Sequence, residues 1–151
     1  MNPCGAGKKR RRLAGFTLPE VVLSISIAGI SSAGILTGYL VSSYSAEWAG
    51  ESLAAQSFAI QGIEQLKACN WNPQALPVID ETTNSYFSTG RTNILDYPIA
   101  GTNYVYATNF FTVVTTANPP LKLLRVDCVW KFRDGKLYTN TVAGYRGPDS
   151  F

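Results

Sequence analysis

Residues 16–46 form a stretch of 31 residues that contains a single charged side chain, that of Glu20. About 20 apolar residues in a helix span the hydrocarbon core of a bilayer, so this stretch is long enough to cross a membrane. It is also longer than the apolar core of a cleavable secretory signal, which has roughly 15 residues at most. The sequence therefore predicts one transmembrane helix over residues 16–46.

A run of five basic residues, KKRRR at positions 8–12, precedes the apolar stretch. Basic residues next to a membrane helix stay in the cytoplasm, so we expect residues 1–15 inside and residues 47–151 on the far side of the membrane. Without residues 1–15, the chain has eight basic and ten acidic residues, a formal net charge of −2 in place of +3. The positive charge thus belongs to the leading segment, and it does not favour nucleic-acid binding by the remainder.

Glu20 lies four residues after Phe16 and inside the predicted membrane helix. An ionisable side chain at this depth costs a few kcal/mol on insertion scales and therefore needs a partner of opposite charge. Two interpretations are open from the residues alone. Glu20 lies at the headgroup level of an ordinary signal anchor, or it pairs with a positive charge, either the basic run or an α-amino group created by cleavage before Phe16.

The segment GFTLPEVVLSISIAG, residues 15–29, resembles the amino-terminal signature of type IV prepilins and type II secretion pseudopilins. The resemblance implies a leader peptide over residues 1–15, cleavage after Gly15, N-methylation of Phe16, and a role for Glu20 in subunit assembly. Many family members carry an aliphatic residue where this chain has Pro19, but proline is tolerated in the first turn of a helix.

The resemblance also implies a function and its partners. The chain would be a structural subunit of a type II secretion pseudopilus or a type IV pilus, and not an enzyme. Its partners would be a prepilin peptidase, other pilins or pseudopilins, and an assembly platform in the bacterial inner membrane. The globular domain would face the periplasm before assembly into the filament. The alternative from a different class is a signal-anchored periplasmic binding or enzymatic domain with one membrane helix.

The helix is expected to continue over residues 47–69, with Leu53, Ile60, Ile63 and Leu66 on its apolar face. Within the membrane part, Gly34 and Gly38 have the GxxxG spacing that permits close helix approach, although a helix of low propensity explains them equally well. The sequence NWNP at residues 70–73 stops the helix. Residues 70–101 are then predicted to form a long loop with one short strand.

Three strands are predicted over residues 103–116, 122–132 and 137–143. In the second, Val126, Cys128, Trp130 and Phe132 alternate with polar residues, so we expect this face to pack on the helix. The sequence RDGK at 133–136 predicts a type I′ hairpin. The predicted fold class is α+β and pilin-like, with a long amino-terminal helix on an antiparallel β-meander over residues 102–147, and the globular domain covers residues 47–151.

No histidine is present, and the three cysteines have no CxxC spacing. These absences remove the common zinc ligand sets and the His-based catalytic triads, so we predict no catalytic residue, metal site or cofactor. Cys4 lies in the predicted leader, which leaves Cys69 and Cys128. A disulfide between them in an oxidising compartment and two separate thiols are both compatible with the sequence.

Overall fold

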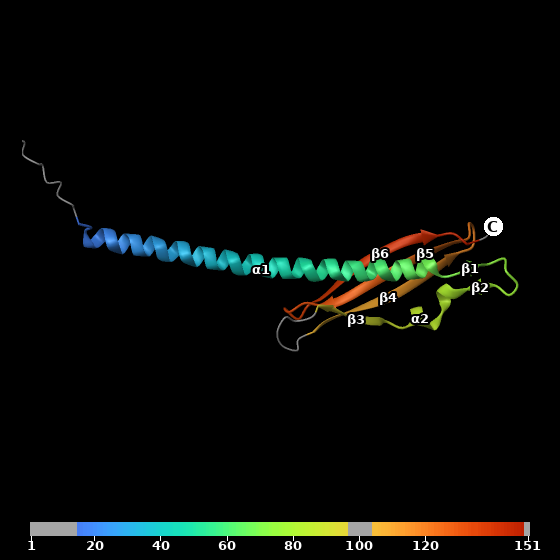
Figure 1. Cartoon of the computed structure of the whole chain (residues 1–151). Coiled ribbons are helices and arrows are strands. Elements are labelled where there is room, and N and C mark those ends of the chain that lie inside the picture. Colours follow the sequence, from blue (N-terminus) through green and yellow to red (C-terminus); the bar gives the residue numbers. More distant parts are fainter. Residues whose placement is uncertain (1–14, 97–103, 150–151) are drawn as a thin grey trace, which may run out of the picture. The chain divides into compact units, whose positions relative to one another are not determined.

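A computed structural model describes residues 15–96 and 104–149 of the chain. It divides into two units, Met1–Ser43 and Tyr44–Phe151, and each is treated separately below. Residues 1–14, which hold most of the predicted leader, lie outside the described residues. A single helix, α1 (Leu18–Ala68), contributes residues to both units (Figure 1).

Helix α1 begins as the sequence predicts, close to Pro19. The carbonyl of Thr17 accepts hydrogen bonds from the backbone N–H groups of Glu20, at 3.0 Å, and Val21, at 3.2 Å. Proline has no N–H to donate, and the second position of a helix needs none. Further along, four hydroxyls bond the carbonyl four residues earlier, those of Ser24, Ser26, Ser32 and Thr37. These four hydroxyls are thus satisfied within the helix, as a lipid environment requires.

The second unit contains a four-stranded antiparallel sheet in the order β3-β4-β5-β6. Its strands are β3 (Arg91–Asp96), β4 (Val105–Thr116), β5 (Leu121–Lys131) and β6 (Leu137–Arg146). The pairing of β5 with β6 is regular over all ten registered pairs, whereas β3 pairs with β4 through a register shift between Ile94 and Asp96. This arrangement confirms the α+β class and the three strands predicted from the sequence.

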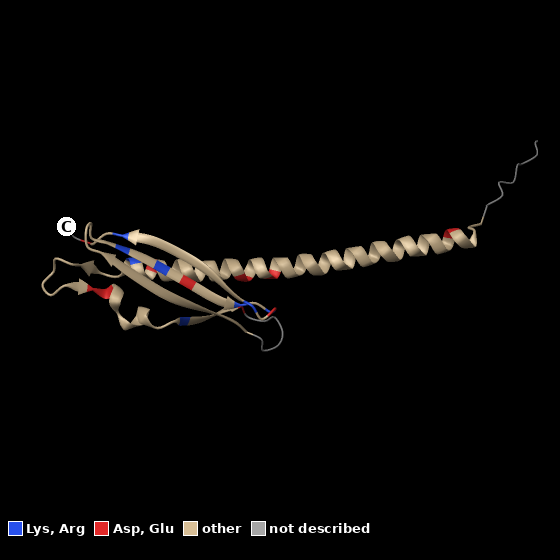
Figure 2. Cartoon of the chain, turned by 180° about the vertical axis from the view of Figure 1, so that it is seen from behind, with Lys and Arg blue, Asp and Glu red and all other residues tan. Residues whose placement is uncertain are grey.

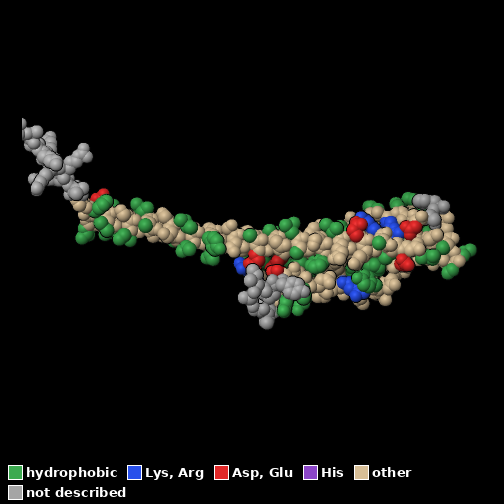
Figure 3. Space-filling view, in the orientation of Figure 1, with side chains coloured by type: hydrophobic (Ala, Val, Ile, Leu, Met, Phe, Trp, Pro, Cys, Tyr) green, Lys and Arg blue, Asp and Glu red, His purple; other side chains and the backbone are tan. Residues whose placement is uncertain are grey.

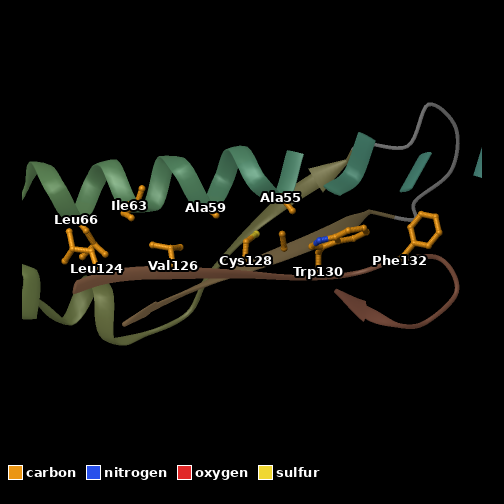
Figure 4. Packing of buried hydrophobic residues seen from close by; sticks show 10 residues of the cluster. Ala55, Ala59, Ile63, Leu66, Leu124, Val126, Cys128, Trp130 and Phe132 are labelled. Atoms are coloured by element: carbon orange, nitrogen blue, oxygen red, sulfur yellow. The ribbon is translucent and has the colours of Figure 1, made fainter. Parts of the chain in front are cut away.

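One face of the sheet packs on the carboxyl-terminal part of α1 and forms the core (Figure 4). Val126, Cys128, Trp130 and Phe132 of the alternating face are at most 1% exposed, which confirms the predicted orientation of β5. The helix meets them with Ala55, Ala59, Ile63 and Leu66. Trp130 also stacks on Tyr138, with ring centroids 5.1 Å apart, and its Nε1–H donates to Asn140 Oδ1 at 2.8 Å. The indole is therefore buried with its polar group satisfied.

Two of the four residues that the sequence predicted on the buried apolar face of the helix are instead exposed. Ile63 and Leu66 are buried, but Leu53 is 72% exposed and Ile60 is 47% exposed. The buried helix residues are Glu51, Ala55, Ala59, Gly62, Ile63 and Leu66. Small residues at four-residue spacing let the helix approach the sheet closely, and the large side chains of β5 fill the space between them. Residue size therefore selects the packed face here more than residue hydrophobicity does.

The hairpin between β5 and β6 is also different from the prediction. A type I′ turn needs a positive φ at both central residues, but within the described turn only Gly135 has one, at +83°. The N–H of Gly135 donates to the carbonyl of Phe132 at 2.9 Å, and the N–H of Phe132 donates to the carbonyl of Lys136 at 3.1 Å. Asp134 accepts the N–H of Lys136, so its side chain stabilises a longer loop with a left-handed glycine.

The predicted loop over residues 70–101 has more structure than the sequence indicated. It contains the two-stranded pair β1 (Trp71–Asn72) and β2 (Ile79–Asp80), the turn η1 (Glu81–Thr83), the short helix α2 (Ser85–Ser88) and strand β3. Residues 97–101 lie outside the described part. β3 is the fourth strand of the sheet. Apolar and polar residues do not alternate cleanly along its sequence, RTNILD, and its register with β4 shifts between Ile94 and Asp96.

Gly62 tests how closely the helix and the sheet approach each other. A Cβ atom at this position would lie 3.1 Å from Phe111 Cε1 and 3.2 Å from Val126 Cγ1. Gly62→Ala is therefore expected to lower the free energy of unfolding by about 1–3 kcal/mol, despite the better helix propensity of alanine. Urea unfolding of the full chain in detergent micelles, followed by tryptophan fluorescence, measures the change.

Gly50 provides the matched control for this substitution. It lies in the same helix, and nothing is within 4 Å of a Cβ built on it. Gly50→Ala is expected to raise the free energy of unfolding by about 0.5–1 kcal/mol, the usual gain from replacing glycine in a helix. Equal gains from both substitutions would show that Gly62 is not in tight contact with the sheet.

Candidate functional site

The amino-terminal end of α1 brings together the three residues that the sequence singles out. Gly15 and Phe16 precede the helix, and Glu20 lies in its first turn. No described residue has an atom within 4 Å of a Cβ built on Gly15, and Phe16 is 81% exposed. Glu20 is also exposed, and it forms no ion pair with any described residue. The peptide bond between Gly15 and Phe16 is thus accessible, about one helical turn before a carboxylate that has no partner of opposite charge among the described residues.

Helix α1 carries no charged residue between Glu20 and Glu47, as Figure 2 shows. Large apolar side chains are exposed along this part of the helix (Figure 3), among them Leu23, Ile30 and Leu36 at 63–75% exposure. It is the one described helix that is long and apolar enough to cross a membrane. A single apolar helix near the amino terminus is compatible with a membrane anchor. In water, so much exposed apolar surface would be strongly unfavourable.

The two cysteines described by the structure are free thiols. Cys128 is fully buried and faces the helix beside Ala55 and Ala59 (Figure 4). Cys69 is ten residues beyond Ala59, or about 15 Å further along a helix axis, and a disulfide needs Cα atoms less than about 7 Å apart. The bridge that the sequence left open is therefore not formed in this fold. Burial raises the pKa of the Cys128 thiol to about 11, which keeps it protonated and unreactive.

A second group of charges lies between α1 and the ends of strands β3 and β5. Glu47 forms an ion pair with Arg133 at 2.5 Å. Glu51 is 6% exposed, and its Oε2 has no hydrogen-bond partner among the described residues. Burial raises the pKa of Glu51, and the neighbouring carboxylates of Glu47 and Asp96 raise it further. Glu51 lies on the packed face of the helix because it is four residues, or about one helical turn, before Ala55.

Lys122 has the most deeply buried charge of the described residues. Its side chain is fully buried, and its ammonium group bonds Asp80 and Thr82 and lies 4.7 Å from the centroid of the Trp71 ring. Burial raises the pKa of Asp80, but hydrogen bonds from Lys122 and Thr82 outweigh it and hold that pKa below its usual value. This cluster fixes the β1–β2 pair and η1 against strand β5. The sequence offered no sign of it, since Lys122 and Asp80 are 42 residues apart.

The described residues do not place three His, Cys, Asp or Glu side chains close enough together to hold a metal ion. Comparison with models of known protein families, with curated proteins and with solved structures finds no match for this chain.

Proposed function

We propose that this chain is a structural subunit of a type II secretion pseudopilus or a type IV pilus. The observation that carries the proposal is the order of features along α1. An accessible Gly15–Phe16 bond comes first, followed by a lone acid in the first turn and by 26 residues without a charge. In the same helix, residues 51–66 then form the core of an α+β domain with the sheet.

In this proposal the membrane helix serves successively as an anchor and as a filament core. A prepilin peptidase on the cytoplasmic side hydrolyses the Gly15–Phe16 bond and methylates the new amine of Phe16. The basic run at residues 8–12 leaves with the leader. The apolar side chains that faced lipid then pack against the helices of other subunits. The same apolar surface is therefore kept out of water both in the membrane and in the filament.

The new amine supplies a positive partner for Glu20, which forms no ion pair within residues 15–96 and 104–149. Phe16 and Glu20 are four residues apart, so the amine and the carboxylate lie about one helical turn apart along the axis. If neighbouring subunits are staggered by about this rise, the Glu20 carboxylate of one meets the Phe16 amine of the next. In a medium of low dielectric constant, an unpaired charge is unfavourable. Pairing between subunits gives each of the two charges a counter-charge and sets the register of the filament.

The processing step is tested by Gly15→Leu. A leucine side chain obstructs the close approach of the backbone to a protease site, so the variant is expected to remain as the full 151-residue precursor. Intact-mass spectrometry of the membrane-bound protein from its host distinguishes the precursor from a mature chain that begins with methylated Phe16. Gly29→Leu is the control, because Gly29 lies within α1 with nothing near its Cβ position, and this variant is expected to be cut normally. A methylated Phe16 terminus in the Gly15 variant would refute the processing step.

A further inference from the structure

A polar pocket of about 220 Å³ in the globular domain takes no part in the filament function proposed above. Gln61 and Gln65 of α1 line one side, Tyr86 of α2 and Arg91 and Asn93 of β3 line another, and Asn109 of β4 is its most buried polar residue. No described Asp or Glu lines it, so its charge comes from Arg91 alone. A pocket with one cation and several amides favours a small anionic ligand with further hydrogen-bonding groups.

Arg91 is held in place but not neutralised. Its guanidinium lies 3.6 Å from the centroid of the Tyr86 ring, and its Nε–H donates to the carbonyl of Tyr86 at 3.3 Å. No described residue forms an ion pair with it, whereas most other basic residues of the described domain have a carboxylate partner. The Nη1 and Nη2 groups are left to form the planar fork that binds a carboxylate through two parallel hydrogen bonds.

Asn109 provides an acceptor that the fold leaves unsatisfied. The residue is 5% exposed, and its Nδ2 donates to the carbonyl of Phe58 at 2.9 Å. A carbonyl only accepts, so this bond fixes which end of the amide is nitrogen. The other end, Oδ1, is buried and has no hydrogen-bond partner in the described part of the chain. Buried polar atoms normally have a hydrogen-bond partner, so a ligand with an N–H or O–H group would complete the site.

Gln65 adds a donor to the same pocket. Its Oε1 accepts from the hydroxyl of Tyr86 at 3.5 Å, which leaves the Nε2 group to donate. The lining therefore offers a guanidinium fork and an amide donor for an anion, together with one acceptor for a neighbouring donor group. We propose that this pocket binds a carboxylate that has a hydroxyl or N–H donor on one of the three carbons next to it. Either a free hydroxy or amino acid, or an Asp or Glu of a docked protein with its backbone N–H, supplies this chemistry.

The test uses the isotope-labelled full chain in detergent micelles and the probe glycolate, with glycolamide as its neutral analogue. Glycolate is expected to shift the side-chain amide signals of Asn109 and Gln65 at millimolar concentration, and glycolamide is expected to bind at least about tenfold more weakly. Arg91→Gln should weaken glycolate binding by a similar factor. Arg125→Gln, which removes a cation paired with Asp127 on the opposite face of the sheet, should leave it unchanged.

A second variant covers the outcome in which Arg91→Gln fails to fold. Gln61 is exposed, so Gln61→Glu adds a repelling carboxylate to the lining without disturbing the core, and it should also weaken glycolate binding. Equal shifts from glycolate and glycolamide, or shifts that survive both substitutions, would overturn the proposal. Because binding is measured on the isolated chain, this result is independent of whether Gly15 is cleaved or filaments form.

The two ligand sources are separated in the host. A photoreactive amino acid replaces Gln61 in the full chain, and crosslinked peptides are identified by mass spectrometry. A crosslink adjacent to an Asp or Glu of another protein, lost on adding Arg91→Gln, supports the proposal and assigns the docked source. Glycolate binding in micelles without such a crosslink supports the proposal and assigns the free acid.

Discussion

Glu20→Ala is expected to leave membrane insertion and cleavage intact and to reduce incorporation into filaments by roughly tenfold or more. The substitution removes a charge from an apolar helix, so insertion becomes easier. Cleavage depends on the residues around Gly15, and Glu20 is five positions beyond it. In the assembled filament, however, the Phe16 amine would lie in a medium of low dielectric constant without its partner. The ratio of sheared filament protein to membrane-bound mature protein, measured by immunoblotting, gives the change.

Two controls separate the charge of Glu20 from its size and from general effects of losing an acid. Glu20→Gln keeps the length of the side chain and is expected to show most of the defect, because the amide cannot neutralise an ammonium group. Glu64→Ala removes an exposed acid further along the same helix, where its partner is the exposed Lys67, and should incorporate normally. Normal incorporation of both Glu20 variants would remove the role proposed for the carboxylate.

The second large effect is expected at the buried ion pair of the globular domain. Asp80→Asn leaves the Lys122 ammonium fully buried without a counter-charge, so we expect the free energy of unfolding at pH 7 to fall by about 3–5 kcal/mol. Lys122→Met should cost less, because the Asp80 side chain is 27% exposed and water can solvate its carboxylate. Urea unfolding followed by tryptophan fluorescence measures both, since Trp71 lies beside Lys122.

The same pair predicts how stability depends on pH. The pKa of Asp80 is lower in the folded chain than in the unfolded chain, so the unfolded state binds more protons in the acid range. The stabilisation is therefore complete above the ordinary carboxyl pKa and is lost as the pH falls through the lowered pKa of the folded state. Asp80→Asn should remove this part of the acid sensitivity.

The control for the ion pair is Glu64→Gln, which breaks the pair with Lys67. Both of those side chains are largely exposed, at 62% and 43%, so the expected loss is below about 0.5 kcal/mol. A loss of similar size in Asp80→Asn would mean that the Lys122 cluster contributes no more than a surface ion pair does.

The sequence predicted features that depend on short segments. The apolar composition of residues 16–46 indicated the long helix, and the period of two along β5 indicated which face packs on it. The sequence also placed Gly15, Phe16 and Glu20 close together, because all three lie within six consecutive residues. It predicted a short strand within residues 70–101 but did not locate β3, whose pairing with β4 shifts midway. It also did not predict the loop type at Gly135, which depends on the hydrogen bonds of Asp134.

By itself, then, the sequence determined the apolar helix, its first acidic turn and the strands of the meander, since each follows from residues close together in the chain. Only the tertiary structure decided that the small residues of the helix face the sheet and bury Glu51 with them. It also separated Cys69 from Cys128, joined Lys122 to Asp80, and placed Arg91 near Asn109. These last three outcomes involve residues 18 to 59 positions apart, and no local pattern encodes such contacts because they depend on how the elements pack.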